Sequence, residues 1–82
     1  MAQKTTFEQV REIVTEHLGL DDSQVLPESN LVNHLGADSL DLMEMLMQAE
    51  DEFDIEIEDK SAESCSTVQD VVDLIDRLVK AK

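Results

Sequence analysis

Residues 67–80 carry a single apolar stripe at the spacing of an α-helix, and this stripe constrains the fold more than any other feature. Apolar side chains at steps of three and four residues share one face of a helix. Such a helix is stable only when that face packs against another layer. The pattern predicts a helix that begins at Thr67 and has Asp70 in its first turn. The stripe consists of Val68, Val71, Val72, Leu74, Ile75, Leu78 and Val79.

A second helix with one apolar face is predicted near the start of the chain. Either Thr5 with Glu8 or Thr6 with Gln9 makes the capping-box pattern that begins a helix. Gly19 is a typical residue to end it. The apolar face between these limits consists of Phe7, Val10, Ile13, Val14, His17 and Leu18. We expect His17 to lie partly buried at the edge of the core.

The middle of the chain predicts a long loop, a further long helix and a short one. Residues 20–36 contain Pro27 and several turn-forming residues, so we expect a loop there. Asp38 is a suitable N-cap for a helix over residues 39–53, and residues 59–65 predict one or two turns of irregular helix. Five apolar residues should hold the loop against the core: Val25, Leu26, Leu31, Val32 and Leu35.

These elements together predict an all-α fold. It is a small four-helix bundle of three main helices and one short helix, with a long loop between the first and second helices. The chain has 82 residues, which is enough for a single domain over residues 1–82 and no more.

The predicted helix over residues 39–53 has two apolar faces, whereas the other long helices have one. The face expected in the core carries Leu42, Met45, Leu46, Ala49 and Phe53. The opposite stripe, here called the apolar ridge, consists of Leu40, Met43 and Met47. The carboxylates that flank it are Glu44, Glu50 and Asp51. A domain this small has no further layer to cover the ridge, and exposed apolar patches are typical of interaction surfaces. The alternative is that the long loop covers it.

The chain is strongly acidic, with 20 acidic and 6 basic residues and a formal net charge of -14. This charge argues against nucleic acid as a partner and favours a monomer that docks on basic protein surfaces. Divalent cations should bind weakly. No apolar run approaches the roughly 18 residues that span a bilayer, so we expect no membrane insertion. The sequence shows no secretory leader, and Cys65 is its only cysteine, so we expect a cytoplasmic protein.

Residues 36–41, with the sequence GADSLD, place a serine hydroxyl in the first turn of a helix. The N-terminal end of a helix favours negative charge by about 0.3–1 kcal/mol, so Ser39 is a suitable place for a phosphate ester. A catalytic serine would also need an oriented base within hydrogen-bond reach. The only histidines are His17 and His34, and we expect no enzyme activity.

Four segments resemble the acyl carrier proteins, and most of all the freestanding carriers of bacterial fatty acid synthesis. They are residues 35–41, 44–49, 52–57 and 67–70. The resemblance implies that a phosphopantetheinyl transferase attaches 4′-phosphopantetheine from coenzyme A to Ser39, and that Asp38 helps to position its magnesium ion. The thiol of the arm would then present acyl groups, as thioesters, to fatty acid synthesis enzymes and acyltransferases.

The resemblance also implies where partners and the acyl chain bind. The docking residues are Leu40, Asp41, Met43, Glu44, Met47, Glu50 and Asp51. The crevice for the acyl chain would be lined by Met45, Leu46, Phe53, Ile57, Ala62 and Cys65. Three departures from the family pattern favour a secondary or specialised carrier: His34, Glu58 and Cys65.

Other functions stay open at this point. A carrier for a dedicated polyketide or special-lipid pathway would share the attachment site, although Asp41 and residues 37–39 favour fatty acids. An acidic interaction module that keeps the fold without the arm is a further alternative. A calcium-binding module is disfavoured, because a loop counted from Asp54 would need glycine and glutamate where Asp59 and Cys65 stand.

Overall fold

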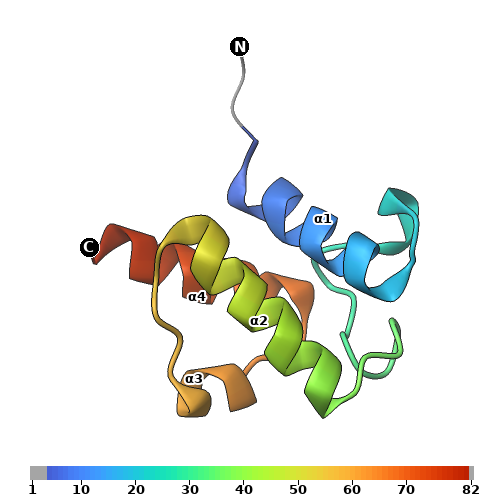
Figure 1. Cartoon of the computed structure of the whole chain (residues 1–82). Coiled ribbons are helices and arrows are strands. Elements are labelled where there is room, and N and C mark those ends of the chain that lie inside the picture. Colours follow the sequence, from blue (N-terminus) through green and yellow to red (C-terminus); the bar gives the residue numbers. More distant parts are fainter. Residues whose placement is uncertain (1–3, 82) are drawn as a thin grey trace.

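A computed structural model describes residues 4–81 and shows an all-α bundle (Figure 1). Its elements are α1 (Thr6–Leu18), the 3₁₀ helix η1 (Asp22–Gln24), α2 (Ser39–Phe53), α3 (Asp59–Glu63) and α4 (Val68–Lys80). The predicted architecture of three long helices, one short helix and a long first connection is confirmed. The turn-forming residues of the loop do not predict η1, which is a single short turn. Residues 1–3 and 82 of the predicted domain lie outside the described part.

The three long helices begin with the same exchange of hydrogen bonds. In each, the N-cap side chain accepts from the amide of the third helical residue, whose own side chain accepts from the N-cap amide. Each cap contributes about 0.5–2 kcal/mol to helix stability. The pairs are Thr5 with Glu8, Asp38 with Asp41, and Thr67 with Asp70. The capping prediction is therefore confirmed, and α1 ends at Gly19 in the left-handed conformation as expected.

The core lies where α1 packs against both α2 and α4. The predicted apolar faces supply most of its buried side chains: Val10, Ile13, Val14, Met45, Leu46, Ala49, Val68, Val71, Val72, Leu74 and Ile75. Val79 belongs to the predicted stripe of α4 but is exposed. It keeps the angular position of Ile75 on the helix. Its exposure follows from its place in the last turn of α4, where the covering layer ends.

The long loop is held against the core by Val25 and Leu31, which are both buried. The prediction is wrong for Leu26 and Val32, which are exposed. Val25 has an extended backbone, and in extended chain successive side chains point to opposite sides, so Leu26 faces solvent. Val32 lies in a turn closed by the side chain of Asn30, which accepts hydrogen bonds from the amides of residues 32 and 33.

The same loop fixes the point at which α2 begins. Its backbone pairs with the segment before α4, through Leu31 N to Ser66 O at 2.9 Å and Val68 N to Ser29 O at 3.0 Å. Further along, the amide of Ala37 donates to Leu31 O at 2.9 Å, and the Ala37 side chain is buried. The residues that lead into α2 are therefore anchored on the core.

Candidate functional site

Ser39 is the first residue of α2, and its side chain is exposed. The anchored Ala37 precedes it by two residues, and Asp38 between them has the extended backbone of an N-cap. The helix therefore begins at a fixed point of the fold and presents a hydroxyl to solvent there. Such a hydroxyl is open to an enzyme that modifies it.

Two carboxylates already lie at this end of α2. Asp38 Oδ1 accepts from the Asp41 amide at 2.8 Å, and Asp41 Oδ2 accepts from the Asp38 amide at 3.2 Å. The hydrogen bond from the Asp38 backbone and a second one from His17 hold the pKa of Asp41 below its ordinary value. A phosphate ester on Ser39 would therefore lie beside two negative charges as well as the positive helix end. A divalent cation would offset this repulsion.

The described residues around Ser39 offer no base to activate it. The Nε2 atom of His17 is bonded to Asp41 Oδ1 at 3.1 Å. The Nδ1 atom of His34 accepts from the Asn30 amide at 2.8 Å, and neither imidazole is bonded to Ser39 in the described part of the chain. The prediction that His17 lies partly buried at the core edge is confirmed, since its side chain is 22% exposed.

An open groove of about 320 Å³ adjoins Ser39, between α2 and the end of α3. Its walls are formed by Ser39, Leu42, Met43, Leu46, Ala62, Glu63 and Cys65. A smaller groove of about 60 Å³ continues the same face of α2 and is lined by Met43, Leu46, Met47, Ile57, Asp59 and Ala62. Of the residues predicted to shelter an acyl chain, the structure thus places Leu46, Ala62 and Cys65 in the groove beside Ser39 and Ile57 in the second groove.

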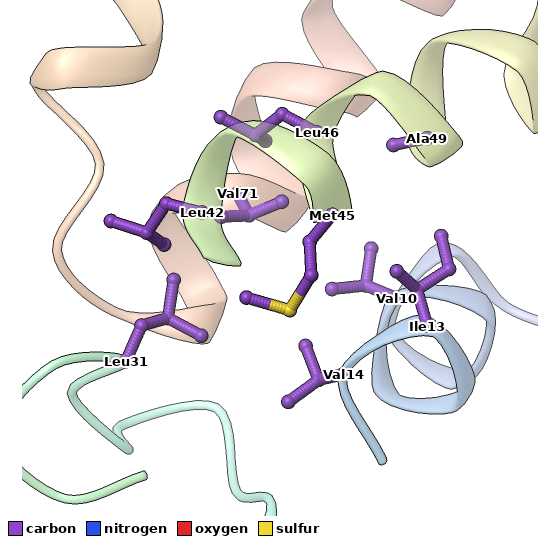
Figure 2. A pocket seen from close by; sticks show the side chains of 9 residues that line it. All are labelled: Val10, Ile13, Val14, Leu31, Leu42, Met45, Leu46, Ala49 and Val71. Carbon is purple, nitrogen blue, oxygen red and sulfur yellow. The ribbon is translucent and has the colours of Figure 1, made fainter. Parts of the chain in front are cut away.

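A separate void of about 20 Å³ lies inside the core between α1 and α2 (Figure 2). It is room for about one water molecule. Met45 points into this space toward Val14 and not into the groove. Phe53 packs against the core and lines neither groove nor the void. Leu42 lines both the void and the groove. The sequence places it on the core face of the helix but does not mark it as part of the site.

Cys65 has a structural environment. It is buried, and its thiol donates to Ser61 O at 3.5 Å. Burial, together with the nearby carboxylate of Asp70, raises the pKa of the thiol. A thiol that stays protonated is a poor nucleophile. The expectation that Cys65 fills a core position is confirmed.

The apolar ridge of α2 is exposed. The accessible fractions of Leu40, Met43 and Met47 are 65%, 57% and 60%. The alternative that the long loop covers this stripe is therefore wrong. Glu44 and Asp51 are exposed beside it. Glu50 is half-buried, and its Oε2 accepts from the Ile57 amide at 2.7 Å, which ties the segment before α3 to α2.

Comparison with known proteins shows which family the chain belongs to. The family model described as "Phosphopantetheine attachment site" matches residues 8–75. A protein from Mycobacterium tuberculosis that is assigned as an acyl carrier protein has the same fold, with a TM-score of 0.84. The two sequences are 32% identical, and the match covers 89% of this chain and 97% of the other. The chain belongs to the acyl carrier protein family.

As a member of this family, the chain carries a covalently attached 4′-phosphopantetheine group, which a phosphopantetheinyl transferase supplies. The described residues fit such a group, because an exposed hydroxyl on a fixed helix start lies beside an apolar groove. Acyl carrier proteins serve enzymes that handle acyl groups and are not themselves catalytic. None of the helices in residues 4–81 has the length and apolar character that crossing a membrane requires.

Proposed function

We propose that this acyl carrier protein holds acyl intermediates as thioesters on an arm attached to Ser39, and presents them to the enzymes of fatty acid biosynthesis. The observation that supports the attachment site most directly is the exposure of Ser39 at the first residue of α2, at the wall of the 320 Å³ groove. The arm supplies the reactive thiol. The chain itself supplies a fixed attachment point, a docking face and a shelter.

Docking is proposed to use the apolar ridge together with the carboxylates of Asp41, Glu44 and Asp51. Charge would steer a basic partner to this face, and the ridge residues would supply the apolar contact. Methionine side chains adapt to partners of different shape, which suits a carrier that visits several enzymes. Glu50 contributes charge to the same face while its side chain holds the Ile57 amide. Asp38 would help to position the magnesium ion of the transferase.

The acyl chain is proposed to lie first against Leu46, Ala62 and Cys65, and then against Ile57, since these residues line the two grooves. Met45 would be reached only by a chain that passes between the helices, because the void around it is small. Phe53 is 14 residues from Ser39, about 21 Å along the helix axis. It would therefore contact only the longest chains.

No catalysis is proposed for this chain, because neither imidazole is bonded to Ser39. We place the carrier in the cytoplasm, since its free, buried thiol is compatible with a reducing compartment. The fatty acid pathway is preferred over polyketide or special-lipid assembly because of Asp41 and residues 37–39. Mass spectrometry of the acyl group on carrier purified from its own cell separates these pathways. Polyketide intermediates would overturn the preference.

The attachment site is tested by incubating the chain with coenzyme A, magnesium and a broad-specificity transferase, and then weighing it. We expect one added phosphopantetheinyl mass in the wild type and none in Ser39→Ala. Ser23→Ala is the matched control, because Ser23 is another exposed serine in a short helical turn; it should gain the full mass. A gain of mass in Ser39→Ala, or none in the wild type, would contradict the proposal.

A further inference from the structure

Three ligand-type side chains from two helices meet beside the start of α2. His17 of α1 has its Nε2 atom 3.1 Å from Asp41 Oδ1 and 3.7 Å from Glu44 Oε1. One donor atom from each residue lies within 4.8 Å of the other two. The cluster forms because α1 packs against α2, and because Asp41 and Glu44 are three residues apart on one helix face.

The spacing of these atoms fits a small tetrahedral cation. Ligands at about 2.1 Å from a zinc ion lie about 3.4 Å from one another in a tetrahedron. The two distances from His17 Nε2 lie on either side of that value. Glu44 is exposed and can close the remaining gap by a change of rotamer. The accessible fractions of the three side chains, 22%, 31% and 54%, leave a path for an ion and room for a solvent ligand.

The donor set separates this cluster from the acidic surface of the chain. Carboxylates alone suit magnesium and calcium, whereas an imidazole nitrogen suits zinc and similar transition metals. His17 is the imidazole that the described residues bring to such a cluster. The two carboxylates complete a mixed nitrogen and oxygen set that leaves a fourth position open.

We propose that His17, Asp41 and Glu44 form a binding site for a divalent transition metal ion of the zinc type, which bridges α1 and α2. The ion takes the place of the proton between Nε2 and Asp41, and the neutral ring then carries its proton on Nδ1. Bound metal neutralises two carboxylates next to Ser39. The site does not depend on the proposed function, because metal binding is measured on the unmodified chain.

The opposing interpretation is an ordinary ion pair between the helices, with zinc bound only diffusely by the negative surface. Isothermal titration of the purified chain with ZnCl₂ in excess MgCl₂ distinguishes the two, because magnesium occupies sites made of oxygen alone. We expect one zinc ion per chain, with micromolar affinity. His17→Gln keeps a hydrogen-bonding side chain but removes the imidazole, and Glu44→Gln removes one charge without changing shape.

Each variant has a matched control in the same chain. His34→Gln removes the other histidine, which is exposed and is not a member of the cluster. Glu52→Gln removes an exposed charge from the same helix. We expect His17→Gln and Glu44→Gln to weaken zinc binding by about tenfold or more, and both controls to bind as the wild type does. Cys65→Ala should also bind normally, which excludes a thiolate site.

Two further measurements distinguish loss of the metal site from loss of the fold. The imidazole nitrogen resonances of His17 should shift on addition of zinc to the wild type, while those of His34 stay in place. Circular dichroism of each variant establishes that the helices persist. Equal binding by His17→Gln and His34→Gln, or zinc that magnesium displaces completely, would overturn the site.

Discussion

Helices α2 and α4 begin with the same capping motif but differ in the burial of their apolar faces. Both start with a capping box whose third helical residue is an aspartate. Helix α4 has one apolar stripe, and most of it is buried. Helix α2 has a buried stripe and, opposite it, the exposed apolar ridge. Capping therefore sets where a helix begins, whereas the distribution of its apolar residues sets what its faces can do.

The exposed ridge contributes little to the stability of the isolated domain. Apolar surface stabilises a fold by roughly 25 cal/mol for each Å² removed from water, and the ridge side chains remain more than half accessible. Their hydrophobic gain is thus available to a partner instead. In helix α4, by contrast, burial of the apolar stripe in the core already stabilises the fold. This difference predicts opposite responses to mutation in the two helices.

The largest effect is expected from truncation in α4. Ile75 is fully buried, so Ile75→Ala should lower the free energy of unfolding by about 2–5 kcal/mol through lost apolar contact and a residual cavity. Met43→Ala removes a comparable side chain from the ridge of α2 and should change it by no more than about 0.5 kcal/mol. Urea denaturation followed by circular dichroism measures both. Equal losses would mean that the ridge belongs to the core.

The next effect concerns docking and should appear only in α2. Met47→Glu places a charge at the proposed contact face and should lower kcat/KM of the phosphopantetheinyl transferase about tenfold, as loss of a central contact does. Val79→Glu makes the same change on the exposed end of α4 and should leave kcat/KM within about twofold. Both variants should keep the helix content of the wild type. A similar loss in both would point to net charge rather than to the ridge.

Local patterns were sufficient to predict the helices, their caps and their faces, because these depend on residues within one or two turns. The capping partners of Thr5, Asp38 and Thr67 are three residues away in each case. The exposure of the ridge follows from the same periodicity and from the small size of the domain. Ser39 could therefore be placed at a helix start from its neighbours alone.

Features that depend on distant residues could not be predicted in this way. The contact of His17 with Asp41 joins residues 24 positions apart and depends on how α1 and α2 are aligned. Met45 lines the inner void, whereas Leu46 lines both the void and the groove, and this difference also depends on how the helices pack. The exposure of Leu26 could not be predicted for a related reason. In an irregular loop, the spacing of apolar residues does not indicate which side chains face the core.

The smallest effect tests the shared capping box at the start of α4. Asp70 Oδ2 accepts from the amides of Ser66 and Thr67 at 2.9 and 3.0 Å. These hydrogen bonds hold the pKa of Asp70 below its ordinary value of 3.8. A lowered carboxyl pKa in the folded state stabilises the fold above the ordinary pKa, and this stability is lost as the pH falls through the folded pKa. Asp70→Asn keeps the shape but cannot carry the charge.

The stability difference between the wild type and Asp70→Asn should therefore favour the wild type at about pH 7 and shrink toward zero as the pH falls below 3.8. Acid also relieves the general repulsion that a net charge of -14 causes. That relief is nearly the same in both proteins, so it cancels in the difference. The stability difference is measured from urea midpoints across this pH range. A difference that does not depend on pH would show that the charge of Asp70 does not contribute to the capping box. Asp41 has the same capping role in α2 but also contacts His17, so Asp70 isolates the charge of the capping box from the cluster beside Ser39.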